Sequence, residues 1–173
     1  MPHTVPTSAR ITVRELARDE DDVLDAVFAG LSPTSRLHRF LGPVPDLLPP
    51  VRRALLAVDG RAHLAVAAFA GRDPIGIARL VREAPGRAEL AVEVVDAWQH
   101  RGIGARLVRA VLARGREAGV VEVVADVMAE NAAALGLRRA LAPGLAGVRD
   151  GHEIRFVAHT TELGASSALP AAA

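Results

Sequence analysis

The strongest structural signal in the sequence is a strand pattern that passes directly into a helix pattern through a turn with two glycines. AELAVEVV, residues 88–95, has the apolar and β-branched composition typical of a strand. IGARLVRAVLARGREAG, residues 103–119, repeats apolar side chains at the spacing of one helix face and ends in glycine. The intervening WQHRGIG places Gly102 and Gly104 where the helix forms its first turn. We therefore expect a strand–turn–helix unit with uncovered main-chain groups at the turn.

The first turn of such a helix is suited to bind an anion. Its backbone N–H groups have no partners within the helix, and the helix dipole adds partial positive charge there. Gly102 and Gly104 let a bulky phosphate approach the main chain, and Arg101 adds a cation. A plain tight turn fits the same residues equally well. Two better-known phosphate motifs are excluded, because the chain has no GxxxxGK[ST] and Leu107 breaks the GxGxxG pattern.

The rest of the chain predicts a mixed α/β domain. Alternating patterns predict strands, and 3.6-residue patterns or cap residues predict helices. Strands are expected at 9–16, 62–70, 74–84, 88–95, 120–128, 144–150 and 152–160, and helices at 19–31, 32–41, 45–58, 103–119 and 131–141. The strands at 62–95 form an antiparallel meander, and the last two form a hairpin. We expect one domain over residues 10–162, with flexible tails at 1–9 and 163–173.

Composition excludes several classes of protein. Half of the 173 residues are hydrophobic and the net charge is +1, which is typical neither of a disordered chain nor of a nucleic-acid-binding surface. With no cysteine, disulfides, thiolate nucleophiles and sulfur-based zinc sites are excluded. The six histidines show no HExxH spacing, so no metal is expected. No leader pattern or apolar run of membrane-spanning length occurs, so we expect a cytoplasmic protein without membrane contact.

The order of strand, helices, antiparallel strands and then V-x-x-x-x-Q-x-x-G-x-G resembles the GNAT superfamily of acyl-CoA-dependent N-acyltransferases. The resemblance covers residues 10–160 and implies an α/β (α+β) fold, with a mostly antiparallel mixed sheet of six to seven strands and about four helices. It implies that acetyl-CoA binds as co-substrate, with its pyrophosphate on the glycine loop and its pantetheine arm along Val94. The implied cofactor contacts are Val94, Val95, Gln99, His100, Arg101, Gly102, Ile103, Gly104, Ala105 and Asn131.

Two phrases, LSPTSRLHRFLGPVP and AELAVEVVDAWQHRGIG, are similar to bacterial GNAT domains that acetylate protein lysines. Acetyl transfer to an amine needs a base, because a lysine amine has a pKa of about 10.4 and is protonated in water. Glu89 and Glu93 are carboxylates on one face of the cofactor strand unless a bulge intervenes. The resemblance implies Glu89 as the general base. A strand glutamate paired with Arg79 or Arg82 is the alternative for either residue.

The last helix departs from the family pattern. Asn131 matches an asparagine that contacts the pantetheine arm, and it also suits a plain N-cap. Many GNAT enzymes have a tyrosine in this helix that protonates the CoA thiolate, whereas Leu135 lies near that point and the chain contains no tyrosine. Ala142 and Pro143 stand as an insertion before Gly144. Water can protonate the thiolate, so the missing tyrosine does not exclude activity. The insertion predicts that the acceptor side differs from that of other family members.

The acceptor side is less defined. Arg36 and His38 are acceptor-side candidates by resemblance, or members of a solvated helix face, and Trp98 is expected to be a packing anchor. His152 and His159 fall in the final hairpin, whose edge at 145–160 could pair with a second chain as a homodimer. We therefore expect an N-acetyltransferase that acts on a primary amine, first a protein lysine and second a small amine. A catalytically weak acyl-CoA-binding regulatory domain is the alternative.

Overall fold

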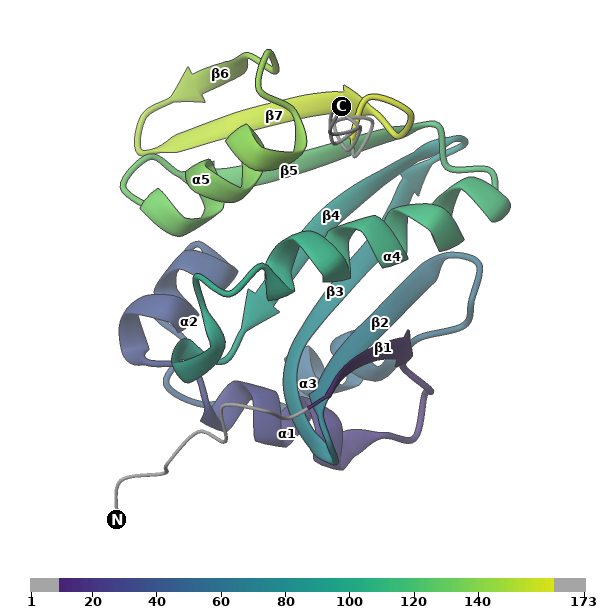
Figure 1. Ribbon diagram of the computed structural model, residues 1–173, viewed down its shortest axis with the longest axis vertical. Helices are drawn as coiled ribbons and strands as arrows, with labels where there is room; N and C mark the ends of the chain where they lie inside the picture. Colours follow the sequence, from purple (N-terminus) through teal and green to yellow (C-terminus); the bar gives the residue numbers. More distant parts are fainter. Residues whose placement is uncertain (1–9, 164–173) are drawn as a thin grey trace, which may run out of the picture.

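The computed structural model describes residues 10–163, which form a mixed fold of strands and helices (Figure 1). The expected tails at 1–9 and 163–173 lie outside the described residues except for Leu163. The chain begins with β1 (Ile11–Glu15) and three helices, α1 (Asp21–Ala29), α2 (Pro33–Phe40) and α3 (Pro49–Leu56). The Oγ atom of Ser32 accepts a hydrogen bond from the Ser35 N–H (3.2 Å), and Pro33 occupies the first helical position. This cap and proline explain where α2 begins.

A long meander then forms the centre of the sheet. It consists of β2 (His63–Ala70), β3 (Asp73–Ala84) and β4 (Arg87–Val94), which pair antiparallel in that order. Glycines at positive φ, Gly71 (64°) and Gly86 (75°), allow the two tight connections. The 3-10 turn Asp96–Trp98 follows, and the chain continues with α4 (Ile103–Glu117), β5 (Glu122–Met128), α5 (Ala132–Leu141), β6 (Gly147–Asp150) and β7 (Glu153–His159).

The seven strands form one sheet in the order β1-β2-β3-β4-β5-β7-β6. β4 and β5 are its only parallel pair within residues 10–163, and they pair at just three positions, the last being Glu89 with Val124. Beyond Glu89 the two strands diverge (Figure 1), so that β4 has β3 as its only strand neighbour. One main-chain edge of β4 between residues 90 and 94 is therefore open to a ligand.

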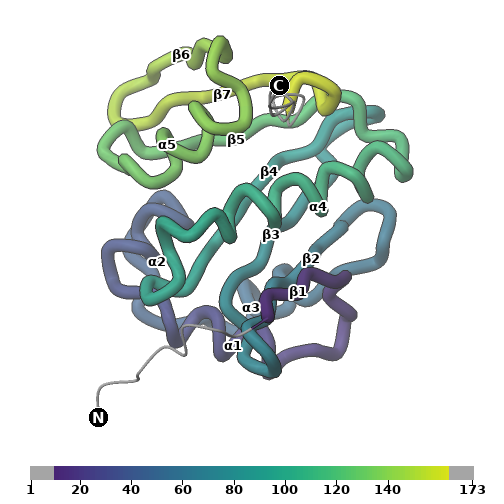
Figure 2. The backbone as a smooth tube through the Cα atoms, in the orientation of Figure 1, coloured from purple at the N-terminus to yellow at the C-terminus, as the bar shows by residue number. Residues whose placement is uncertain are grey.

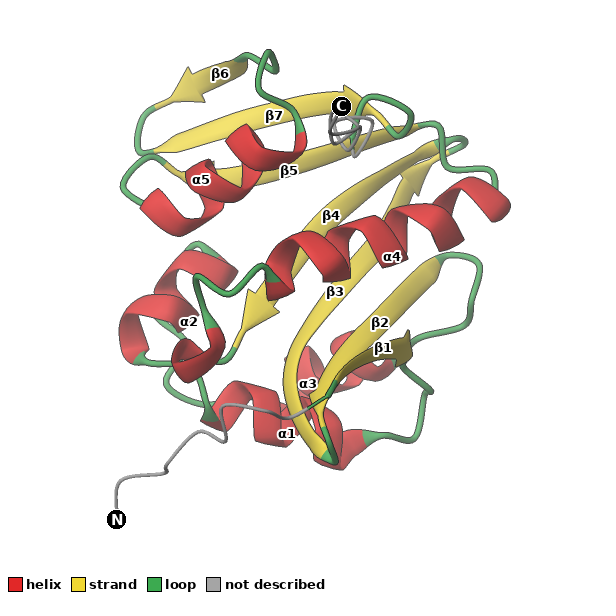
Figure 3. Cartoon of the chain, viewed as in Figure 1, coloured by secondary structure: helices red, strands yellow, loops and turns green. Residues whose placement is uncertain are grey.

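Helices cover both faces of the sheet (Figure 3). On one face, α4 buries Leu107, Val111 and Leu112 against β2 and β3. On the other face, α1 and α3 pack over alternate residues of β2, including Ala67 and Phe69. Because successive strand residues point to opposite faces, the same strand supplies both cores. All eight residues of β2 are buried as a result. The tube in Figure 2 follows the chain through these layers.

The expected fold class is confirmed, with seven strands and five α-helices in the described region rather than about four. The residue patterns predicted these five helices, including three separate ones before β2, whereas the family resemblance implied about four. The final hairpin is confirmed as β6 paired antiparallel with β7 at the sheet edge. The pairing of β4 with β3 is regular from Ala88 to Val94, and its one irregularity lies between Arg82 and Ala84. None of the helices in the described range is long and apolar enough to cross a membrane.

Candidate active site

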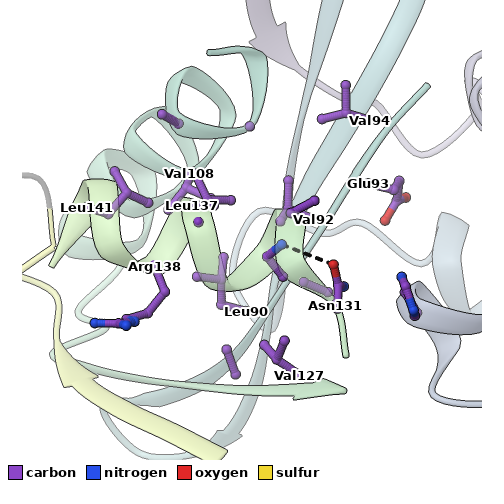
Figure 4. Close-up of a pocket in the computed structure, with 18 of the residues that line it drawn as sticks. Leu90, Val92, Glu93, Val94, Val108, Val127, Asn131, Leu137, Arg138 and Leu141 are labelled. Atoms are coloured by element: carbon purple, nitrogen blue, oxygen red, sulfur yellow. Dashed lines mark hydrogen bonds between the residues drawn. The ribbon is translucent and has the colours of Figure 1, made fainter. Parts of the chain in front are cut away.

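A cavity of about 560 Å³ opens where β4 and β5 diverge. α4 and α5 form its walls on one side, and α2 contributes on the other. Figure 4 shows that its interior is mainly apolar, with Leu90 and Val92 from β4, Val108 from α4 and Leu137 and Leu141 from α5. An apolar groove beside an open strand edge can hold an extended chain that also carries amide groups, because such a chain can pair with the strand's free N–H and C=O groups.

The glycine turn lies at the mouth of this cavity. His100 and Gly102 both have positive φ, 59° and 76°, and Gly102 is the N-cap of α4. Gly102 has no side chain that could cap the helix, so the N–H groups of the first turn remain available to a ligand. A Cβ atom on Gly102 would have no atom within 4 Å, whereas one on Gly104 would lie 3.3 Å from Leu137 Cδ2. The first glycine provides the backbone turn, and the second provides close packing of α4 against α5.

Gln99 turns back onto the protein. Its Nε2 donates to the Val94 carbonyl (3.0 Å), to Ser35 Oγ (3.3 Å) and to Asp96 Oδ1 (3.3 Å). Its side chain therefore connects the end of β4, the turn and α2. Gln99 therefore stabilises the conformation of the glycine turn. The free N–H groups at the start of α4, rather than the Gln99 side chain, are available to bind an anion at the mouth of the cavity.

Most of the cofactor contacts expected from the sequence line one cavity. These are Val94, Gln99, His100, Gly102, Ile103, Gly104, Ala105 and Asn131. Two residues do not line it. Val95 packs into the core beneath α1 and α3, and the Arg101 guanidinium lies 5.1 Å from the ring centroid of Trp98. Trp98 packs against the core on the α4 side, as an anchor would, and also lines the cavity.

Asn131 marks the beginning of α5. Its Oδ1 accepts a hydrogen bond from the Ala134 N–H (3.0 Å), which confirms the N-cap interpretation (Figure 4). Asn131 also lines the cavity, and its amide N–H₂ group is not used by that bond. Contact with a ligand is therefore compatible with the cap.

Glu89 and Glu93 share a face of β4 but have opposite surroundings. Glu89 is exposed and lines the cavity at the point where β4 and β5 separate. Glu93 is buried, with its side chain 4% exposed, and accepts hydrogen bonds from Arg39 Nε and from an Arg79 terminal nitrogen (3.3 Å). Burial by itself would raise the pKa of Glu93, but the charges and hydrogen bonds of Arg39 and Arg79 outweigh it and hold this pKa below its usual range.

This arrangement confirms the alternative for Glu93, a strand glutamate paired with Arg79, and shows that the same alternative is wrong for Glu89. Arg79 is bound to Glu93, and Arg82 donates to the main-chain oxygens of Ala118 (2.8 Å) and Arg61 (3.4 Å). Neither arginine forms an ion pair with Glu89. The Glu93 carboxylate, engaged by two guanidinium groups, is a poor proton acceptor.

On the acceptor side, only one of the two sequence candidates lines the cavity. His38 lines it, and its Nε2 is 3.8 Å from Glu130 Oε1. Arg36 instead donates to the carbonyls of Pro45 (2.6 Å) and Phe28 (3.2 Å), and so holds the segment after α2. Arg39 lines the cavity and was not singled out from the sequence. It lies 54 residues from Glu93, and a long-range ion pair leaves no local pattern.

α5 presents a mainly apolar wall to the cavity, with Asn131 and Arg138 as its polar members. Ala134 lines the cavity whereas Leu135 does not. The LAPGL segment is a tight turn held by Arg138, which donates to the carbonyls of Ala142 (3.4 Å), Pro143 (3.1 Å) and Leu145 (3.2 Å). Within residues 10–163, no three His, Asp or Glu side chains are grouped as metal ligands.

Known proteins show the same architecture. An acetyltransferase of Pseudomonas aeruginosa is 30% identical in an alignment of 159 residues. The alignment covers 88% of this chain and 84% of that protein. The GNAT domain of S. lividans PAT superposes with a TM-score of 0.77 at 25% identity, covering 85% of this chain and 89% of that domain. The PaiA N-acetyltransferase of Thermoplasma acidophilum, solved in complex with coenzyme A, has a TM-score of 0.64 at 18% identity, covering 87% and 99%.

A structural match also exists to part of a larger protein. The chain superposes on 46% of a cAMP-binding acyltransferase from Mycobacterium smegmatis, with a TM-score of 0.60 at 23% identity over 90% of this chain. The model of the acetyltransferase (GNAT) family matches residues 32–141, which contain β4, the glycine turn and α5. The family match and the 30% identical relative show that this chain belongs to the GNAT acetyltransferase family and is an acyltransferase.

Proposed function

We propose that this acyltransferase takes acetyl-CoA as donor and transfers the acetyl group directly to a primary amine, with protein lysine as the first choice of acceptor. The observation that carries the donor assignment is the open edge of β4, which ends at the uncapped first turn of α4. The N–H groups of Ile103, Gly104 and Ala105 would hold the pyrophosphate. The pantetheine amides would pair with β4 beyond Glu89, and its methylene groups would lie on the apolar lining.

We assign Glu89 as the general base. Its carboxylate lies at the inner end of the open edge, on the face away from α4, where an amine can approach from solvent. The neutral amine attacks the thioester carbonyl, its extra proton passes to Glu89 directly or through water, and the C–S bond breaks as the C–N bond forms. Free N–H groups of β4 stabilise the oxyanion that develops.

The CoA thiolate would take its proton from water. α5 lines the cavity with small and apolar residues and one arginine, and the chain has no tyrosine; these α5 residues are Ala132, Ala133, Ala134, Gly136, Leu137, Arg138, Ala140 and Leu141. A thiolate has a much lower proton affinity than an alkoxide, since a thiol pKa is near 8.5. Transfer can therefore proceed without an acid on α5, with an effect on the rate rather than on the products.

The acceptor assignment depends on the two sequence phrases at 31–45 and 88–104, which resemble lysine-acetylating domains. The exposed position of Glu89 supports it, because a lysine on another protein needs a base near the surface. A small-molecule amine is the second candidate. The lack of a tyrosine in the α5 wall favours a third candidate, a catalytically weak domain that binds acyl-CoA and regulates a partner. A cytoplasmic location and a homodimer formed through the β6 edge stay predictions.

Calorimetric titration with acetyl-CoA, followed by a free-thiol assay with lysine peptides and small amines, tests this proposal. Binding accompanied by thiol release with a lysine peptide is expected. Tight binding without release from any amine would favour the regulatory domain, and release with small amines alone would identify the second candidate. An absence of binding would reject all three.

A further inference from the structure

α2 is held in place by polar contacts together with half-buried apolar side chains, among them Phe40, whose ring centroid lies 6.1 Å from that of Phe28 on α1. None of its eight residues is buried, although it packs against β4. At its N-terminal end, the Ser32 N–H donates to Asp96 Oδ1 (3.3 Å) and Gln99 donates to Ser35 Oγ (3.3 Å). At its C-terminal end, Arg39 pairs with Glu93. Because no side chain of α2 is fully buried, these directional contacts contribute to fixing its position.

The Arg39–Glu93 pair belongs to a buried cluster of three charges. Arg79 is 1% exposed and donates both to Glu93 (3.3 Å) and to the Leu55 carbonyl of α3 (2.8 Å). Arg39 is 12% exposed and Glu93 is 4% exposed. The cluster therefore ties α2, α3, β3 and β4 together. Ion pairs removed from water contribute little net stability relative to apolar groups of equal volume, but their geometry specifies how elements are oriented.

The orientation of α2 matters because the helix bridges the gap between β4 and β5. Its Ser35, His38 and Arg39 line the cavity opposite β4. On the β5 side, its only ion-pair contact within the described residues is His38 with Glu130, at 3.8 Å, and Glu130 is 67% exposed. On the β4 side, Arg39 Nε donates one hydrogen bond to Glu93, whose side chain is 4% exposed and whose other carboxylate oxygen accepts from Arg79 (3.3 Å). α2 is therefore fixed to the strand that carries Glu89 and loosely attached to the other side.

We propose that Arg39 is a positioning residue, whose buried pair with Glu93 holds α2 on β4 and so sets the width of the acceptor opening beside Glu89. This inference rests on the proposed function, because it assigns the α2 side of the cavity to the acceptor. The hydrogen bonds and ion pairs of Arg39 and Glu93 within the described residues involve neither α4 nor α5, and the glycine turn is held to the other end of α2 by a separate bond, from Gln99 to Ser35 (3.3 Å). Loss of Arg39 should therefore weaken acceptor binding and leave CoA binding intact.

The test compares Arg39→Met with Arg53→Met, an exposed arginine on α3 that serves as the matched control. In Arg39→Met we expect the acceptor KM to rise at least tenfold, with kcat within threefold and the CoA Kd within twofold of wild type. Arg39→Lys, which keeps the charge without the planar fork, should fall between the two. Arg53→Met should match wild type. An unchanged acceptor KM in both Arg39→Met and Arg39→Lys would overturn the proposal.

A second variant separates positioning from packing. The triple substitution Arg39→Met/Glu93→Leu/Arg79→Met replaces the charges with apolar volume, and such replacements commonly keep a protein folded. We expect it to retain a Tm close to that of wild type and to keep the raised KM. Recovery of the wild-type KM in the triple variant would show that packing alone positions α2. If Arg39→Met does not fold, Arg39→Lys and the triple variant decide the question.

Hydrogen exchange provides a readout that needs no acceptor. In Arg39→Met the amides of residues 36–40 should exchange at least tenfold faster than in wild type, whereas those of α4 should be unchanged. Equal exchange of α2 in the two proteins would contradict the proposal. If the wild-type protein releases no thiol with any amine, the proposed function fails, but the exchange result still shows whether Arg39 holds α2.

Discussion

Two glutamates on the same face of β4 show how far the surroundings of a residue decide its chemistry. Glu93 is enclosed by Arg39 and Arg79, which lower its pKa and occupy both carboxylate oxygens. Glu89, four residues earlier, is exposed and lines the cavity. Their spacing in the sequence places them on one face but cannot distinguish them, because the two arginines come from α2 and β3. Of the two, Glu89 is therefore the residue that we propose as the proton acceptor.

Glu89→Gln should therefore lower the turnover number by about 10²-fold, since the variant keeps the shape of the side chain and cannot accept the proton. Thiol release at saturating acetyl-CoA and amine measures the effect. Glu83→Gln, at an exposed glutamate of the neighbouring strand, is the control and should retain full activity. Turnover in Glu89→Gln equal to that of the control would reassign the proton to ordered water.

His63 gives the protein a second residue-level property, a dependence of stability on pH. It is 6% exposed, and its Nε2 is buried without a hydrogen-bond partner among the described residues. Burial, together with the charge of Arg79, lowers the pKa of His63 to about 4. Below pH 6.5 the unfolded chain binds a proton that the folded chain does not. Proton binding to His63 in the unfolded chain therefore lowers the free energy of unfolding. The loss begins as the pH falls through 6.5 and grows until the pH reaches about 4, where the folded chain binds the proton too.

Urea unfolding at several pH values tests this property. We expect the free energy of unfolding to fall with a slope of at most about 1.4 kcal/mol per pH unit between pH 6.5 and 4. His63→Leu should flatten the slope in this window, and His152→Leu, at an exposed histidine, should not. Equal slopes in the two variants would exclude His63. Below pH 4, Glu20 and Asp126, whose carboxyl pKa values are lowered by hydrogen bonds from Arg14 and Arg155, should destabilise all three proteins.

At the scale of elements, the two ends of α4 have the same local geometry and different surroundings. Gly102 at its start and Gly119 after its end have φ values of 76° and 80°, and an added Cβ would meet nothing within 4 Å at either position. Only Gly102 lines the cavity. Substitutions at the two glycines therefore distinguish backbone strain from loss of ligand binding, because both would introduce strain and only Gly102 lies at the cavity.

Gly102→Ala and Gly119→Ala should each cost about 1 kcal/mol of stability, because alanine disfavours positive φ. We expect Gly102→Ala alone to raise the Kd for CoA, by about tenfold, since the strain disturbs the N–H groups that face the pyrophosphate. Calorimetric titration of both variants measures the difference. An equal Kd in both would mean that the α4 N-terminus does not hold the cofactor.

The elements themselves could be predicted from local sequence. Apolar periodicity located α4, and Ser32-Pro33 and Asn131 marked the starts of α2 and α5. The positions where strands stop pairing could not be predicted. β5 pairs with β4 at only three positions, and no local pattern in either strand marks where this pairing ends.

For the whole molecule, the cavity extends across elements from both halves of the sheet, so a ligand in it should stabilise the fold as a unit. A ligand that binds only the folded state adds about 2.7 kcal/mol at 100 times its Kd. For a chain of this length, that corresponds to a rise in Tm of roughly 5–10 °C. Thermal unfolding with CoA and with adenosine alone measures the effect. If adenosine alone raised the Tm as much as CoA does, the binding energy would not come from the pantetheine arm in the cavity beside β4.

The sequence by itself determined the helices, the central strands and the glycine turn, because these depend on periodicity and turn chemistry within a few residues. From its motifs it also indicated the GNAT family, which the comparisons confirm. Only the tertiary structure decided that Val95 and Arg101 lie outside the cavity, that Arg39 reaches Glu93 and that Glu89 remains exposed. The physical reason is that burial and ion pairing depend on which distant segments meet, and Arg39 and Glu93 are 54 residues apart.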